Sequence, residues 1–274
     1  MDLALFHRFA TLAHRRAGIS LHEGKLTLVE ARVGKRVRAL GLSDAGTYLR
    51  FLEDDRTGEE LVQFLDVITT NFTSFFREPD HFELLRAQLA QCYQAGQRRV
   101  RLWSAASSSG EEPYSMAITL LDTLDDPALD ARILATDLSS RMLARAQAGH
   151  YLEKAVAPVP PALRQRHFSP TGPDPKGNPQ VTVSREARAL VTFKRLNLAK
   201  PPFPMPGPLD VVFCRNVMIY FDQPVRQALI TDIERLLKPG GLLLIGHTET
   251  LTGIQSRLGT VRPSVYQKPH GASR

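Results

Sequence analysis

Apolar residues recur at helical spacing through residues 1–70 and indicate a series of short helices. Asp44 and residues 57–60 provide polar starts for a third and a fourth helix. The clearest apolar repeats are Leu3, Phe6, Ala10 and Ala13, and then Leu26, Val29, Val33, Val37 and Leu40. Short helices with no strand pattern between them predict an all-α N-terminal domain over residues 1–70.

From about residue 98 the pattern changes to short apolar runs that alternate with helical segments. We expect strands at 100–104, 132–136, 209–214 and 242–246, helices at 112–124, 140–148 and 224–237, and an edge strand within 262–268. Such alternation is typical of a parallel sheet with helices on both faces. The prediction is an α/β domain over 98–274, preceded by a linker and connecting helix at 71–97.

The alternation is interrupted between about 155 and 196, where seven prolines exclude a long helix. Residues 181–183 and 191–193 have strand patterns, and His167 and Phe168 are candidates for a third strand. We therefore predict a small antiparallel β insertion on the main sheet. An open, proline-rich loop is the alternative.

Composition restricts the class of protein without identifying it. Hydrophobic residues make up 43% of the chain, and no apolar run is long enough to cross a bilayer. Charged residues interrupt residues 1–20, so we expect no secretory signal, and the distant pair Cys92 and Cys214 predicts neither a disulfide framework nor a metal site. A cytoplasmic location follows from these expectations. The net charge of +7 favours an anionic partner, which is a nucleic acid, a membrane surface or an acidic protein.

The most informative segment follows the predicted strand at 209–213. Polar residues at the carboxyl end of a buried strand line the crevice in which open α/β sheets bind ligands. Arg215, Asn216 and Tyr220 are placed there by the sequence. A capped strand end with a core tyrosine is the structural alternative.

A second polar cluster follows the first predicted strand. Residues 105–110 are small, so backbone can approach a ligand, and Glu111 and Glu112 start the next helix. The segment has neither the G-x-G-x-x-G nor the P-loop pattern. Asp137 ends the second strand, where an acid can accept bonds from two ribose hydroxyls. A ribose with a cationic amino-acid end describes S-adenosylmethionine, although Glu111 alone also fits a helix-dipole carboxylate worth about 0.3–1 kcal/mol.

Taken together, four segments resemble the chemotaxis receptor methyltransferases (the CheR family). The first is residues 71–78 (Asn-Phe-Thr-Ser-Phe-Phe-Arg-Glu), and the second is residues 103–106 with 110–115 (Trp-Ser-Ala-Ala and Gly-Glu-Glu-Pro-Tyr-Ser). The third is residues 214–221 (Cys-Arg-Asn-Val-Met-Ile-Tyr-Phe), and the fourth is residues 237–241 followed by 246–249. The resemblance extends over about 60–268, whereas the first 60 residues match in helical character alone.

The resemblance implies a class I, Rossmann-like S-adenosylmethionine-dependent methyltransferase that O-methylates glutamate side chains of chemoreceptors. It places Arg77 and Tyr220 nearest the transferred methyl group. The residues that it implies around the cofactor are Asn71, Thr73, Arg77, Glu111, Asp137, Asn197, Leu198, Arg215 and Asn216. The loop at 107–109 departs from the family in having three serines.

A glutamate substrate simplifies the chemistry, because its carboxylate is already ionised at neutral pH and needs no general base. An arginine and a tyrosine hydroxyl can orient such a carboxylate without taking its proton. A tight arginine bond also lowers nucleophilicity, so Arg77 is expected to steer or to hold cofactor more than to activate. The histidines 81, 150, 167 and 247 fit no metal-site spacing, and we assign them to packing or surface roles with no metal expected.

Two surfaces are candidates for partner binding. Lys25, Arg32 and Arg36 form a basic stripe beside the apolar face of the helix at 25–40, either a solvated face or a docking site for the acidic helical region of receptors. The β insertion offers an edge for a receptor C-terminal peptide. No nucleic-acid partner and no membrane insertion are expected.

Two other functions compete with this interpretation. One is a methyltransferase of another substrate class, acting on RNA or another protein, but the chain has no [DNS]-P-P-[FY] motif and no basic stretch interleaved with aromatic residues. The other is a non-catalytic scaffold that senses the cofactor. Such a scaffold is expected to have lost Arg77 or Tyr220, and both are present.

Overall fold

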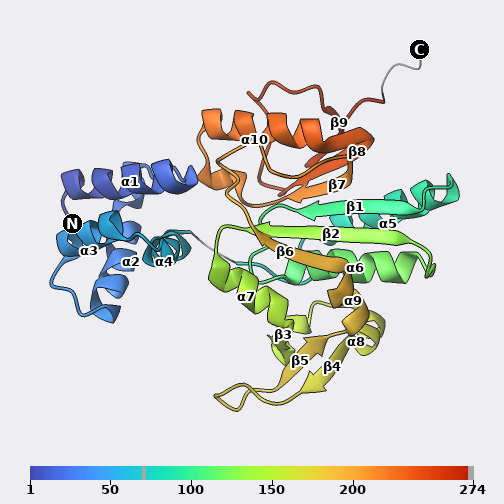
Figure 1. Ribbon diagram of the computed structural model, residues 1–274, viewed down its shortest axis with the longest axis horizontal. Coiled ribbons are helices and arrows are strands. Elements are labelled where there is room, and N and C mark those ends of the chain that lie inside the picture. Colours follow the sequence, from blue (N-terminus) through green and yellow to red (C-terminus); the bar gives the residue numbers. More distant parts are fainter. Residues whose placement is uncertain (70–71, 271–274) are drawn as a thin grey trace.

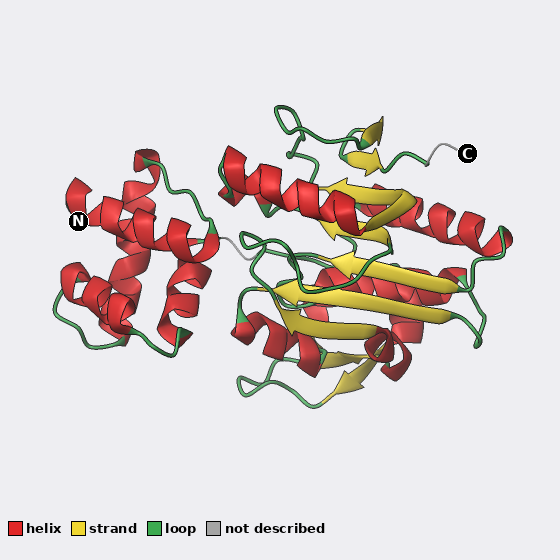
Figure 2. Cartoon of the chain, turned by 45° about the horizontal axis from the view of Figure 1, so that its top comes forward, coloured by secondary structure: helices red, strands yellow, loops and turns green. Residues whose placement is uncertain are grey.

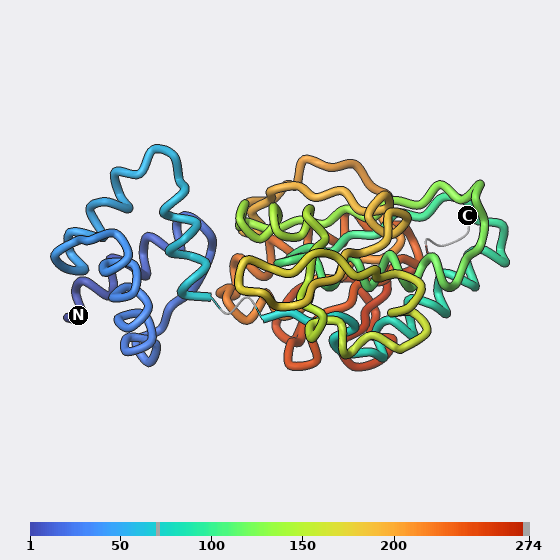
Figure 3. Tube along the Cα trace, turned by 90° about the horizontal axis from the view of Figure 1, so that it is seen from below, coloured from blue at the N-terminus to red at the C-terminus, as the bar shows by residue number. Residues whose placement is uncertain are grey.

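The computed structural model describes residues 1–69 and 72–270. Four helices form the N-terminal domain, which lies to one side of the sheet in Figure 1 (blue) and is seen from below in Figure 3. They are α1 (Leu3–Ala17), α2 (Leu26–Ala39), α3 (Ala45–Asp54) and α4 (Glu59–Ile68), with a short 3₁₀ helix η1 (Glu23–Lys25) before α2. The predicted helical character of this region is confirmed.

Local sequence sets the ends of these helices. The Asp2 carboxylate accepts the Leu5 amide at the start of α1, and the Asp44 carboxylate accepts the Thr47 amide at the start of α3. Gly18 ends α1 in the left-handed conformation, with φ 70°. The apolar faces meet in one core that includes Phe6, Phe9, Val29, Tyr48, Leu49 and Phe64.

The second domain is built on a seven-stranded sheet in the order β6-β2-β1-β7-β8-β10-β9. Strands β6, β2, β1, β7 and β8 are parallel, and β10 and β9 complete one edge in antiparallel pairing. The strands are β1 (Arg99–Ser104), β2 (Asp130–Asp137), β6 (Val191–Arg195), β7 (Leu209–Cys214), β8 (Leu237–Ile245), β9 (Gly259–Arg262) and β10 (Val265–Gln267). The predicted α/β class is confirmed.

Helices cover both faces of this sheet (Figure 2). Successive strand residues point to opposite faces, so Phe213 packs in the core with α5 and α6, whereas Val212 packs in the core with α10. The helices of this domain are α5 (Pro79–Gln94), α6 (Glu111–Thr123), α7 (Ser140–Ala148), α8 (Pro161–His167), α9 (Arg185–Leu190) and α10 (Gln223–Leu236), with short 3₁₀ helices η2 (Glu153–Val156) and η3 (Met218–Tyr220). No helix among the described residues is both long and apolar enough to span a membrane.

The small antiparallel sheet exists, but one of its predicted strands was misplaced. It has the order β3-β5-β4, with β3 (His150–Leu152), β4 (Phe168–Thr171) and β5 (Gln180–Val183). The segment 191–193, which we expected in this insertion, lies in β6 and pairs in parallel with β2 as the outer strand of the main sheet. The reason is α9, which ends at Leu190 and returns the chain to that edge. The third strand is instead β3, directly after α7.

Candidate active site and cofactor pocket

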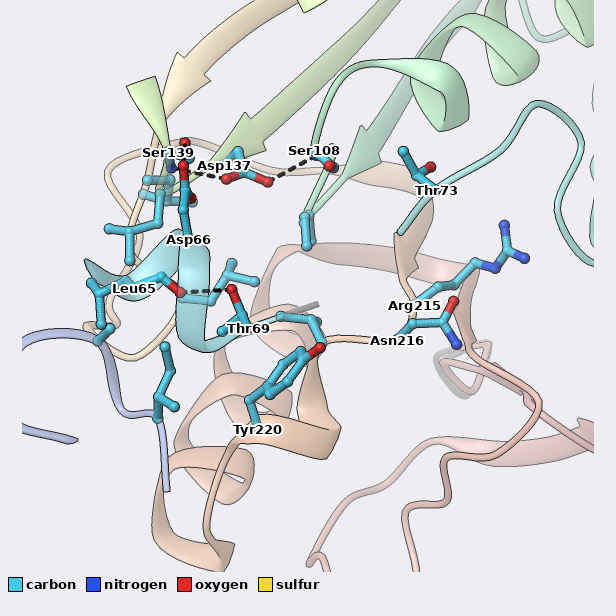
Figure 4. Close-up of a pocket in the computed structure, with 18 of the residues that line it drawn as sticks. Leu65, Asp66, Thr69, Thr73, Ser108, Asp137, Ser139, Arg215, Asn216 and Tyr220 are labelled. Carbon is cyan, nitrogen blue, oxygen red and sulfur yellow. Dashed lines mark hydrogen bonds between the residues drawn. The ribbon is translucent and has the colours of Figure 1, made fainter. Parts of the chain in front are cut away.

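A pocket opens at the carboxyl ends of β1, β2 and β7, between the sheet and the helical domain. Ile19, Leu65 and Asp66 line it from the helical side, and Asp137 and Arg215 line it from the sheet. Figure 4 shows Asp137 and Ser108 at one wall, Arg215 and Asn216 at a second and Tyr220 at a third. The polar residues that follow distant strands in the sequence therefore meet in one site.

Asp137 is held as an oriented acceptor at the end of β2. One carboxylate oxygen accepts the Ser108 amide at 2.8 Å, and the other accepts the Ser139 amide at 2.9 Å. Burial raises the pKa of Asp137 above its usual value, although these backbone bonds oppose the rise. Each oxygen retains acceptor capacity toward the pocket, which suits a vicinal pair of hydroxyls.

The loop between β1 and α6 depends on one glycine. Gly110 has φ 97°, and a Cβ atom there would lie 2.7 Å from the Tyr151 hydroxyl and 2.8 Å from the Ala146 Cβ. The loop is tied to β2 by the bond from the Ser107 amide to the Thr136 carbonyl, at 2.9 Å. Glycine is therefore needed for close packing as well as for its backbone conformation.

Arg215, just after β7, has a buried guanidinium that links three segments of the chain. Its guanidinium lies 2.9 Å from a Glu78 oxygen and 3.1 Å from a Glu112 oxygen, and it donates to the Arg77 carbonyl. Burial raises the pKa of Glu112. Burial opposes ionisation of Glu78 too, but the charge of Arg215 prevails and holds the pKa of Glu78 below its usual value. Arg215 therefore shapes the pocket by joining the segments that carry Arg77 and Glu112.

The turn after Arg215 is fixed by Glu249. The Glu249 carboxylate accepts the amides of Asn216, Met218 and Gly246 at 2.7–2.8 Å. Asn216 adopts the left-handed conformation, with φ 57°. A Cβ atom at Gly246 would lie 2.3 Å from the Asn216 side-chain nitrogen, so only glycine fits there. The sequence pointed to residues 246–249, yet it assigned no role to Glu249.

The structure brings together the two residues predicted nearest the transferred methyl group, because Arg77 and Tyr220 both line the pocket. The Arg77 guanidinium donates to the Phe72 carbonyl at 2.9 Å and lies 5.6 Å from the Phe72 ring centre. Among the described residues it has no carboxylate within ion-pair distance. The Tyr220 carbonyl accepts the Ser20 amide at 2.7 Å, which joins the tyrosine to the helical domain.

The other predicted cofactor residues divide into three groups. Thr73, Asn197, Leu198 and Asn216 line the pocket, and Asn197 also donates to the Arg16 carbonyl at 2.7 Å. Asn71 lies outside the described residues. Glu111 is not among the lining residues.

The buried Glu111 carboxylate accepts the Ser109 hydroxyl at 2.7 Å, and its neighbour Glu112 lines the pocket instead. A cofactor contact by Glu111 therefore stays a prediction. The role of Glu112 was missed because adjacent acids at a helix start cannot be told apart by sequence.

The basic stripe of α2 has partners within the helical domain. Arg36 donates from Nε and from one terminal amino group to the two Glu60 carboxylate oxygens, at 2.8 and 2.6 Å, and Arg32 donates to the Val67 carbonyl at 2.9 Å. Lys25 lies 5.8 Å from the centre of the Tyr220 ring, which places it beside the pocket. Substrate binding by these three residues stays a prediction.

A parallel sheet with this strand order, closed by an antiparallel edge and carrying its pocket at the carboxyl ends, defines a class I S-adenosylmethionine-dependent methyltransferase. The residues fit the cofactor. Asp137 offers carboxylate acceptors, which suit hydroxyl groups, and Arg77 offers a guanidinium, which suits a carboxylate, and their contacts with the cofactor stay predictions. Leu138, Leu196 and Leu198 offer apolar surface in the same pocket.

Comparison with known proteins identifies the family. Residues 71–266 match the model of the CheR methyltransferase, SAM binding domain, and residues 4–69 match that of the CheR methyltransferase, all-alpha domain. The chain is 41% identical to the chemotaxis protein methyltransferase of Klebsiella aerogenes, covering 92% of this chain and 84% of that one. It is 40% identical to that of Escherichia coli, covering 96% and 90%. The chain belongs to the CheR methyltransferase family, as its sequence motifs predicted.

Proposed function

We propose that this protein transfers the methyl group of S-adenosylmethionine to glutamate side chains on the cytoplasmic helices of chemoreceptors, and so serves chemotaxis. Membership of the CheR family supports the methyltransferase activity, and the names of the relatives support the chemotactic role. The choice of a carboxylate substrate rests on the chemistry of the pocket.

The observation that carries the proposal is the set of residues available to the reaction. The described residues that line the pocket include no histidine, cysteine or lysine. Of the three carboxylates among these lining residues, Glu112 is paired with Arg215, Asp66 is paired with Arg141, and Asp137 accepts two backbone amides. An amine substrate is protonated at neutral pH and has to lose a proton before attack, whereas a carboxylate is already a competent nucleophile. The pocket therefore suits glutamate.

Each residue then has a positional task. The cofactor, when bound, supplies a methyl group activated by the sulfonium. Asp137 holds the ribose, and Arg77 and Tyr220 orient the entering carboxylate, which lowers the entropic part of the barrier. The helical domain covers the pocket through contacts such as the bond from the Asn197 side chain to the Arg16 carbonyl, and thereby excludes water.

Recognition of the receptor is assigned to two surfaces. The first is the stripe of Lys25, Arg32 and Arg36 on and beside α2, whose positive charge complements acidic receptor helices and whose Lys25 lies beside the pocket. The small sheet leaves β3 and β4 as edge strands, and either edge can accept an extended receptor peptide by strand addition.

The test is to incubate the purified protein with radiolabelled S-adenosylmethionine and receptor-rich membranes. We expect labelled receptor whose label is released by mild base as methanol, because carboxylate esters hydrolyse and N-methyl groups do not. Label that survives base, or that appears in RNA, would contradict the proposal. Cofactor binding with no transfer would identify the scaffold alternative.

A further inference from the structure

Three side chains that are far apart in the sequence converge beside Arg215. Glu78 precedes α5, His81 lies in its first turn and His247 follows β8. One ligand atom of each lies within 4.8 Å of the others. Sequence spacing did not predict this cluster, because 166 residues separate the two histidines and the sheet brings them together.

His81 presents a lone pair to this cluster. The His81 Nε2 atom lies 2.9 Å from the Ser264 hydroxyl oxygen, and that hydroxyl donates its proton to the Pro263 carbonyl at 2.6 Å. Nε2 must therefore carry the hydrogen and donate to Ser264, which leaves Nδ1 unprotonated in the neutral ring.

The Nδ1 atom of His81 is buried and has no hydrogen-bond partner among the described residues. The side chain is 0% exposed, and Nδ1 faces a Glu78 oxygen at 3.4 Å. A lone pair and a carboxylate at that distance repel each other unless an electropositive group lies between them. A hydrogen bond from one ring nitrogen to a fixed acceptor is the arrangement that orients an imidazole whose other nitrogen binds a metal.

The spacing of the atoms suits a small divalent ion. Metal–ligand distances of about 2.0–2.2 Å place tetrahedral ligands roughly 3.3–3.5 Å apart. Glu78 Oε2 lies 3.4 Å from His81 Nδ1 and 3.9 Å from His247 Nε2. His247 Nε2 also lies 3.1 Å from an Asp80 oxygen, but Asp80 is not one of the three residues whose ligand atoms converge. Two imidazoles and one carboxylate form a ligand set that zinc and similar ions accept, with one position left for water.

The charges around the cluster also favour a cation. Glu78, Glu112 and Asp80 contribute three carboxylates, against the buried guanidinium of Arg215 and the partly exposed Arg262, which lies 3.8 Å from Asp80. His247 and Asp80 are about half exposed, so the site is open to solvent on that side. An ion can therefore enter without unfolding of the core.

We propose that Glu78, His81 and His247 form a binding site for a divalent transition-metal ion of the zinc type, with the remaining position open to solvent. The site fastens the start of α5 to the end of β8. It also meets the cofactor pocket through Arg215, which contacts Glu78 and lines that pocket.

The test titrates Co²⁺ alone into the untagged, chelator-treated full chain and follows the visible absorption of tetrahedral Co²⁺. We expect saturable binding of one ion per chain, and displacement of the band by Zn²⁺. His247→Ala should weaken Co²⁺ binding at least tenfold, and because His247 is half exposed, this variant should unfold at the same denaturant concentration as the metal-free wild type.

His150→Ala is the matched control, since His150 is exposed on β3 in the small sheet, and it should bind Co²⁺ like the wild type. Asp80→Asn removes a charge beside His247 without removing one of the three ligands, so it should weaken Co²⁺ binding less than His247→Ala does and leave the fold unchanged. Absence of one-to-one binding, or equal affinity in wild type and His247→Ala, would overturn the site.

Discussion

Charged groups at the carboxyl edge of the sheet and on the basic face of α2 are held in different ways. At the sheet edge, Asp137 and Glu249 accept backbone amides, and Arg215 is 1% exposed between two carboxylates. On α2, Arg36 pairs with one side chain, Glu60, and remains 20% exposed. Backbone donors fix a charge far more rigidly than a flexible partner side chain. The first region is thus preorganised for chemistry, whereas the second can exchange one partner for another.

The largest expected effect is a loss of cofactor affinity, and it tests the rigid region at the carboxyl edge of the sheet. Asp137→Ala removes the two charge-assisted bonds that we propose to the ribose, each worth about 1.5–3 kcal/mol, so S-adenosylhomocysteine should bind at least tenfold more weakly, and roughly 10²- to 10⁴-fold if the two losses add. Calorimetry measures the affinity. Asp130→Ala, at the opposite and exposed end of β2, is the control and should bind normally. Unchanged affinity in a folded Asp137→Ala protein would remove Asp137 from the site.

A smaller effect separates chemistry from cofactor binding within the same region. Tyr220→Phe deletes one hydroxyl that is proposed to position the substrate oxygen, so methyl transfer should slow by roughly tenfold or more, while cofactor affinity changes little. Single-turnover rates and calorimetry provide the two measurements. Tyr93→Phe, whose hydroxyl bonds Asp126 away from the pocket, should transfer at the normal rate. Equal losses of rate and affinity would count against this role of Tyr220.

The smallest effect concerns α2. Replacing Arg32 and Arg36 by Glu should raise the apparent KM for receptor several-fold, leave cofactor affinity unchanged and remove most of the salt sensitivity of the rate. The reason is that exposed charges are screened over about 8–10 Å near physiological ionic strength. Initial rates at several salt concentrations test this.

The contacts of Arg36 and Arg32 sharpen the design of that experiment. Because Arg36 is paired with Glu60, the free energy of unfolding has to be measured alongside the kinetics. Lys35→Glu with Arg38→Glu makes the same change of charge at two exposed positions of α2 and serves as the control. If the Arg32 and Arg36 variant behaves like the wild type, α2 is a solvated face only.

The predictable part of the molecule is the part determined by neighbours in sequence. The ends of the predicted strands located Asp137 and Arg215. Helix caps and apolar spacing located the four N-terminal helices, because each of these signals spans only a few residues. The family resemblance then supplied Arg77 and Tyr220.

What could not be predicted depends on contacts between distant segments. The strand at 191–193 was assigned to the wrong sheet because its pattern does not say which strand it pairs with. The partner of Arg36 lies 24 residues away on another helix. The Glu78, His81 and His247 cluster likewise exists only after β8 is placed beside the start of α5.

Because each domain supplies one wall of the pocket, a bound ligand affects the stability of the contact between the two domains. Ile19 and Leu65 belong to one domain and Asp137 to the other, and the direct links between the domains include the bridge from Ile19 to Phe221 and the bond from Ser139 to Asp66. A ligand that contacts both walls binds the docked arrangement alone. At a hundred times its Kd it stabilises that arrangement by about 2.7 kcal/mol. We therefore expect S-adenosylmethionine to strengthen the docking of the helical domain onto the sheet domain as well as to supply the methyl group.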